Sequence, residues 1–148
     1  MAATKKSTPY AAQDITPEEL SLVRSYLLLT FIHKVFERDC RVIGKSGLFK
    51  TPQLYMELVS TGAKRTSLML QEVNRELDLH NLKVITILQD VHGVVARYNC
   101  RDCPGELNMM WPGFRREMML RMRAYLGLAN DFSILSREDH VEQLAMTL

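Results

Sequence analysis

The sequence predicts a mainly α-helical fold with one β-hairpin, in the α+β class. Two Thr-Pro pairs, at residues 16–17 and 51–52, are typical of helix starts, with a capping residue before a proline in the first turn. Residues 84–101 alternate in the manner of two strands joined by a turn. A run rich in methionine and arginine follows and favours a closing helix.

The size of the chain suits one domain, because 148 residues with 47% hydrophobic content can bury a core. We expect that domain over residues 16–127. A disordered N-terminal arm (1–15) is expected before it, and a C-terminal tail (128–148) with a short helix from Ser136 is expected after it.

Charge and cysteine content narrow the class of protein. The formal net charge of +2 excludes a globally basic nucleic-acid binder, so any such surface must be local. Three cysteines without a secretory leader are typical of a reduced, cytoplasmic protein. The most hydrophobic stretch, residues 20–36, is interrupted by charges and falls short of a membrane span, so no membrane partner is expected.

The helical elements follow from their start signals. Thr16 and Glu19 form a capping box around Pro17, and an apolar helix runs from there toward the charged residues 37–41 and the glycines beyond them. Thr51 and Pro52 start a shorter helix, which "STG" at residues 60–62 breaks. A third helix is expected from Ala63 to about residue 79, which makes a helix-turn-helix candidate.

The hairpin and the closing helix complete the predicted order. Residues 90–93 supply the turn, and the second strand places Arg97 and Arg101 on one face. "CPGE" at residues 103–106 is expected to end the hairpin. The fourth helix is expected to begin between Asn108 and Pro112 and to end before Gly127.

Three helices, a hairpin and a closing helix, in that order over residues 16–127, resemble the winged helix-turn-helix DNA-binding superfamily. Its PadR-type repressors and the bacterial replication terminator are similar in carrying a helix after the wing. The resemblance implies a winged helix-turn-helix with an additional C-terminal helix. It further implies a dimeric, sequence-preferring binder of double-stranded DNA, such as a small transcriptional regulator.

The resemblance also implies which residues would contact DNA, because the helix from Ala63 would enter the major groove and the hairpin would lie along the backbone. The implied contacts are Lys64, Arg65, Thr66, Ser67, Gln71, Asn74, Arg97 and Arg101. Two alternatives stay open. The helical residues can be the solvated face of an amphipathic helix, and the two arginines can protect a strand edge by charge.

A dimer interface is expected on the first and fourth helices, whose large apolar side chains exceed what one small core readily hides. Its predicted residues are Leu27, Phe31, Trp111, Phe114, Met118, Met122 and Tyr125. Ordinary core packing is the alternative for these side chains. Arg115, Arg116 and Arg123 could instead contact nucleic acid.

Catalytic and metal motifs are missing from the sequence. Cys100 and Cys103 have the spacing of half a zinc site, but Cys40 and the histidines are scattered singly, so no metal and no cofactor is expected. No phosphate loop or nucleophile motif occurs, and an enzyme is not expected. The alternative function is a helical adaptor or regulatory protein that binds a protein partner through methionine-rich and aromatic surfaces.

Overall fold

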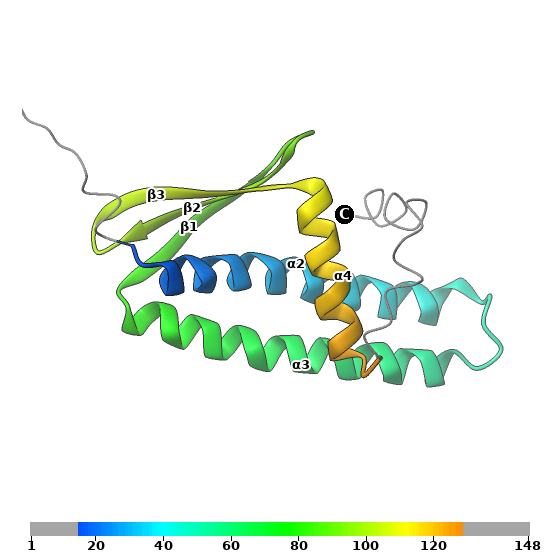
Figure 1. Ribbon diagram of the computed structural model, residues 1–148. Coiled ribbons are helices and arrows are strands. Elements are labelled where there is room, and N and C mark those ends of the chain that lie inside the picture. Colours follow the sequence, from blue (N-terminus) through cyan, green and yellow to red (C-terminus); the bar gives the residue numbers. More distant parts are fainter. Residues whose placement is uncertain (1–14, 129–148) are drawn as a thin grey trace, which may run out of the picture. The chain divides into compact units, whose positions relative to one another are not determined.

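The computed structural model describes residues 15–128, which form two long helices, a three-stranded antiparallel sheet and a last helix (Figure 1). The elements in chain order are α2 (Pro17–Ser46), α3 (Pro52–Leu79), β1 (Leu82–Gln89), β2 (Gly93–Cys100), β3 (Cys103–Met110) and α4 (Trp111–Tyr125). The α+β class is confirmed. The predicted N-terminal arm, apart from Ile15, lies outside the described residues, as does the predicted C-terminal tail with its helix from Ser136, apart from Leu128.

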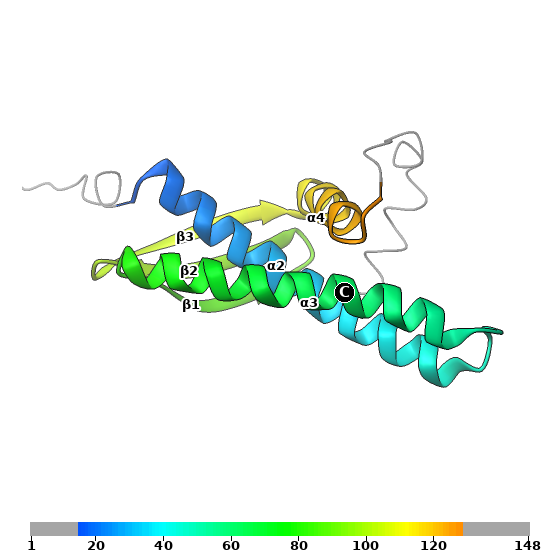
Figure 2. The ribbon, with the colours of Figure 1, turned by 90° about the horizontal axis from the view of Figure 1, so that it is seen from below.

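Two compact units divide the described residues. The sheet unit comprises residues 15–27 and 72–110, and the hairpin unit comprises residues 28–71 and 111–128. Within the hairpin unit, the last part of α2 lies antiparallel beside the first part of α3 (Figure 1, Figure 2).

The winged-helix order of elements is wrong for this chain. That order needs three helices before a two-stranded wing, whereas here two helices precede three strands. The error began at residues 60–62, where α3 continues without a break from Pro52 to Leu79. No helix-turn-helix is therefore present in the described residues.

Gly62 explains why this helix does not break. The residue is buried, and a Cβ added to it would lie 3.0 Å from side-chain carbons of both Phe36 and Leu126. The glycine therefore permits close packing on one helical face, which offsets its helix cost of about 0.5–1 kcal/mol. The neighbouring Thr61 hydroxyl donates to the carbonyl of Glu57 (2.9 Å), so it too is satisfied inside the helix.

The sheet has the order β1-β2-β3, and its third strand was not predicted. Pro104 and Gly105 were interpreted as the end of the hairpin. In the structure they pair with Asn99 and Tyr98 of β2. Proline is tolerated there because β3 is an edge strand, and the Tyr98 ring occupies the space above Gly105, within 2.5 Å of where a Cβ would stand.

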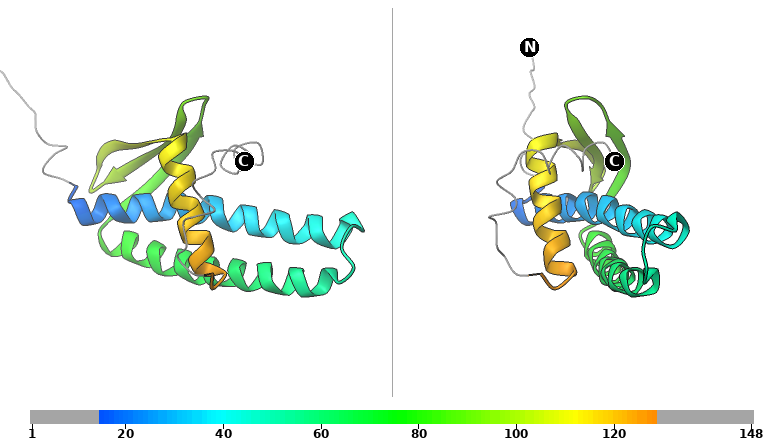
Figure 3. Two further views of the ribbon diagram at one scale, coloured as in Figure 1. Left: turned by 45° about the vertical axis from the view of Figure 1, so that its right-hand side comes forward. Right: turned by 90° about the vertical axis from the view of Figure 1, so that its right-hand side faces the viewer.

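Packing in the hairpin unit centres on α4, which crosses α2 and α3 (Figure 3). The rings of Phe31 on α2 and Phe114 on α4 meet edge to face, with centroids 5.0 Å apart. Met118 and Met122 are buried on the same side of α4. The helix ends as predicted, since Gly127 has a φ of +77° and the Leu128 amide bonds back to the Arg123 carbonyl (2.8 Å).

Candidate interaction surface

The closed end of the helical hairpin (residues 40–58, hereafter the hairpin end) is formed where α2 stops and α3 starts. Gly47 adopts a φ of +69°, a left-handed conformation that ends α2 after Ser46. Pro52 takes the first helical position of α3, as predicted, and the Leu54 amide bonds to the Thr51 carbonyl (3.2 Å). Local sequence signals therefore fix this turn.

Large apolar side chains lie exposed at the hairpin end, and we call this set the apolar tip. Leu48 in the loop is 86% exposed and Leu54 on α3 is 62% exposed. The rings of Phe49 and Tyr55 contact each other, with centroids 5.3 Å apart. The members of the apolar tip are Val42, Leu48, Phe49, Leu54, Tyr55 and Leu58.

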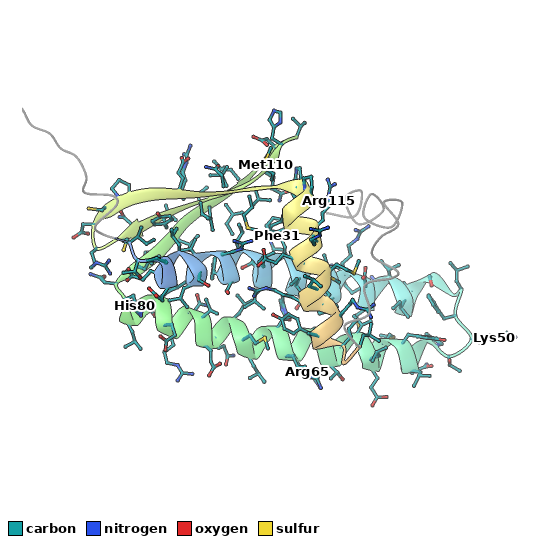
Figure 4. The ribbon with its side chains drawn as sticks, in the orientation of Figure 1. Phe31, Lys50, Arg65, His80, Met110 and Arg115 are labelled. Carbon is teal, nitrogen blue, oxygen red and sulfur yellow. The ribbon has the colours of Figure 1, made fainter. Side chains whose placement is uncertain are left out.

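Positively charged residues outnumber acidic ones at the hairpin end. The hairpin end carries Arg41, Lys45 and Lys50, and Glu57 is its one acid. Figure 4 shows Lys50 where the chain turns between α2 and α3.

A groove of about 420 Å³ lies on the last turns of α2, and we call it the cationic groove. It is lined by Arg38, Arg41, Val42, Lys45 and Ser46. The three cations follow an i, i+3, i+7 spacing, which places them on one helical face. Burial raises the pKa of the neighbouring Asp39, with Arg38 acting in the opposite direction.

A second groove of about 510 Å³ runs between α2 and α3, lined by His33, Glu37, Cys40, Arg41, Ser60, Ala63, Lys64 and Ser67. The Thr66 hydroxyl donates to the Ala63 carbonyl (2.8 Å), so its oxygen accepts from His33 Nδ1 (3.1 Å). His33 Nε2 lies 3.1 Å from Glu37 Oε1. The hydrogen bond between His33 and Thr66 therefore joins α2 to α3, and we assign these side chains a structural role rather than a role in ligand binding.

The sheet unit contains a compact charge group, hereafter the Glu19 cluster: Glu19, His80 and Arg101. Arg101 donates to both carboxylate oxygens of Glu19 (2.6 and 3.0 Å), and His80 Nδ1 lies 3.0 Å from Oε2. Glu19 also makes the predicted capping box, with bonds of 2.9 and 3.1 Å to Thr16. The Arg101 hydrogen bonds, more than any other contact, lower the pKa of Glu19 to about 2.

The turn between β2 and β3 holds Arg101 in place to bind the Glu19 carboxylate. Arg101 and Asp102 both have positive φ, +48° and +68°, as a tight two-residue turn between strands requires. The Arg101 amide bonds to the Asn81 carbonyl (2.9 Å), and its guanidinium also donates to the His80 carbonyl (3.1 Å). Sequence reasoning missed the cluster, because Glu19 and Arg101 are 82 positions apart.

The residues predicted to contact DNA lie on one long helix and on the sheet. Lys64, Gln71 and Asn74 are exposed, Ser67 is half-buried and Thr66 is buried.

The predicted arginines already bond within the chain. Arg65 donates to the Tyr125 carbonyl (2.6 Å) and Arg101 belongs to the Glu19 cluster. Arg97 bonds Glu106 (3.1 Å), and both of these side chains are about half exposed. DNA contact by any of these residues stays a prediction.

The predicted dimer-interface side chains lie mostly inside one chain. Leu27, Phe31, Phe114, Met118, Met122 and Tyr125 are buried. Trp111 is half-buried, stands edge-on to Phe114 and has the Arg115 guanidinium 5.6 Å from its ring centre. The dimer stays a prediction, and its proposed contacts are those of a core.

Metal-binding groups and membrane-spanning helices are both absent from residues 15–128. These residues contain no group of three or more His, Cys, Asp or Glu side chains that could hold a metal ion. Cys100 pairs with Cys103 in the register across the β2–β3 turn, and no disulfide joins them. None of the helices within this range combines the length and apolar character needed to cross a bilayer.

Comparison with known proteins identifies the family of this chain. Neither the curated proteins nor the solved structures contain a match to the chain. The YhjD protein family matches residues 14–130, which include both long helices, the sheet and α4. The chain belongs to the YhjD protein family.

Proposed function

We propose that this protein is a binding module that engages a partner through its hairpin end, acting without catalysis. The apolar tip carries the proposal, because six large apolar side chains are exposed within the short stretch where α2 ends and α3 begins. Apolar exposure concentrated in one part of a small domain commonly marks an interaction site. Burying one such leucine contributes roughly 1.5–3 kcal/mol, so a partner covering several of them gains appreciable free energy.

The pattern along α3 supports the same surface. Met56 and Val59 are half-buried and Thr66 is buried, whereas Leu54 and Leu58 lie on an exposed stripe of the helix. Charged or polar residues would serve solubility better on such a stripe. The apolar side chains at these positions therefore have no evident packing role among residues 15–128.

This proposal modifies the adaptor alternative, which assigned the contact to methionine-rich and aromatic surfaces. Met118 and Met122 of α4 are buried, so the surface moves to the leucines and aromatic rings of the hairpin end. It is preferred to DNA binding because Arg65 and Arg101 bond elsewhere in the chain and Thr66 is buried.

We place the module in the cytoplasm. No disulfide joins Cys40, Cys100 and Cys103, and a reducing compartment keeps cysteines in that state.

Site-specific photo-crosslinking in living cells tests the proposal. A photoreactive benzophenone amino acid replaces Phe49, and the control places it at Val91, which is exposed in the β1–β2 turn. We expect adducts to another molecule from position 49 and none above background from position 91. Equal yields from the two positions, or none from either, would contradict the proposal.

A further inference from the structure

We propose, resting on the function above, that the hairpin end docks onto an anionic phospholipid surface. Leu48 and Phe49 insert among the acyl chains near the headgroups, and lipid phosphates bind in the cationic groove. The sequence predicts no membrane partner, because hydropathy along a chain detects spanning segments and not a short apolar turn.

The insertion step follows from the loop "KSGLFK", residues 45–50. Leu48 and Phe49 stand at the end of the turn between Lys45 and Lys50. Lysine stems lie along apolar surface while their ammonium groups reach toward phosphates, so this flanking suits the water–lipid boundary. Tyr55, beside Phe49, has the amphipathic ring that is enriched at that boundary.

The shape of the surface favours a bilayer over a protein. The apolar tip takes Val42 from α2, two residues from the loop and three from α3, so it surrounds a protruding turn. A helical peptide partner would require an apolar groove. The cavity beside the tip instead contains three cations and one apolar residue, Val42. A fluid lipid surface can accommodate a protruding apolar turn without a matching pocket.

The headgroup step follows from charge. The cationic groove, about 420 Å³ in volume, presents Arg38, Arg41 and Lys45 on one face of α2. Guanidinium and ammonium groups are the usual partners of phosphate oxygens. Glu37 and Asp39 flank Arg38 in sequence, and Glu57 lies on α3. With Lys50 in the loop, four positive side chains outnumber these three acids.

Vesicle flotation with the full chain tests the proposal. Vesicles contain phosphatidylcholine alone or mixed with phosphatidylglycerol, and we expect binding to the mixed vesicles to be stronger by about tenfold or more. Leu48→Ser with Phe49→Ser should weaken that binding by about tenfold or more. The matched control is Val91→Ser, since Val91 and Leu48 are both 86% exposed, and it should bind like the wild type.

Charge variants separate the headgroup step from insertion. Lys45→Gln and Lys50→Gln should each weaken binding to the anionic vesicles by about fivefold. Lys83→Gln, on an exposed residue of β1, should leave it unchanged. Thermal unfolding monitored by circular dichroism verifies that each variant stays folded. Free glycerol phosphate should not displace the protein from vesicles, because it offers the phosphate without the apolar layer.

Several outcomes would overturn the lipid proposal. They are failure of the wild type to float with anionic vesicles, equal loss for the Val91 control, and full displacement by glycerol phosphate. If vesicles are not bound while position 49 still crosslinks to a protein, the binding module stands and its lipid partner is wrong. If vesicles are not bound and position 49 yields no adduct, both proposals fail.

Discussion

The Glu19 cluster buries a charged side chain, whereas the hairpin end exposes apolar ones. In the cluster a carboxylate that is 2% exposed has its oxygens bonded to Arg101, His80 and Thr16. At the hairpin end, leucines and aromatic rings lie in water beside lysines. The polar groups of the cluster thus find their hydrogen-bond partners within the chain, whereas the hairpin end exposes apolar surface that a second molecule can cover.

The difference separates two uses of arginine and lysine. Arg101 fixes the β2–β3 turn to the start of α2 within the sheet unit, so its charge stabilises the fold. Arg41 and Lys45 line a groove on one helical face, where their charges can meet an anion from outside. Substitutions in the cluster should therefore change stability, and substitutions at the hairpin end should change binding.

The largest effect on stability is expected from Arg101→Met, which leaves the Glu19 carboxylate buried without its main partner. We expect the free energy of unfolding to fall by about 3 kcal/mol. Arg97→Met is the matched control, because its partner Glu106 is exposed, and it should cost no more than about 1 kcal/mol. Urea unfolding of both variants gives the two values. Similar losses would remove the distinction between a buried and an exposed ion pair.

Acid should weaken the Glu19 cluster in a defined pH window. Glu19 has a folded pKa of about 2 against an ordinary 4.5, so its contribution is complete above pH 4.5. It is lost as the pH falls from 4.5 toward 2, and its size is about 2–3 kcal/mol after allowing for the partly exposed Arg101. The free energies of unfolding of the wild type and of Glu19→Gln, measured between pH 4.5 and pH 2, give this contribution by difference. A stability difference that is independent of pH would show that Glu19 does not contribute through its charge.

A smaller effect is expected from Arg65→Met, which removes the bond to the Tyr125 carbonyl. The loss should be about 1–1.5 kcal/mol, whereas Lys64→Met, for which no such bond is seen, should stay within about 0.5 kcal/mol of the wild type. Chemical unfolding measures both. DNA binding by this helix would instead make both variants lose affinity for duplex DNA, with a steep dependence on salt.

The smallest stability change is expected at the apolar tip. Leu48→Ser should alter the free energy of unfolding by no more than about 0.5 kcal/mol, because the side chain is 86% exposed. Thermal unfolding of this variant beside Val91→Ser measures the change. A loss well above that of the control would mean that Leu48 packs within the folded chain and that the tip is part of its core.

Local signals in the sequence predicted the ends of the helices well. The Thr16–Glu19 capping box, the Thr51-Pro52 start and the helix end at Gly127 depend on neighbours within a few residues. Gly62 and Pro104 were misinterpreted because their roles depend on distant partners. Gly62 packs against Phe36 and Leu126, and Pro104 pairs with a strand of the sheet.

The functional surface was hidden from sequence reasoning for a related physical reason. Periodicity marks Leu54 and Leu58 as apolar helix positions, but only the fold decides which apolar stripe is covered. Arg65 and Arg101 likewise look available in the sequence, although each bonds to a group at least 60 positions away. The methionines of α4 suggested a surface, but Met118 and Met122 are buried.

The most direct test measures the yield of photo-adduct from position 49 in two variants, Arg101→Met and Leu48→Ser. It asks whether the Glu19 cluster determines stability while the hairpin end determines binding. We predict that Arg101→Met lowers the free energy of unfolding but keeps the adduct wherever the chain remains folded. Leu48→Ser should keep the stability and lose most of the adduct. The contrary result, in which Leu48→Ser retains the full adduct or Arg101→Met loses it while folded, would contradict the assignment of binding to the hairpin end.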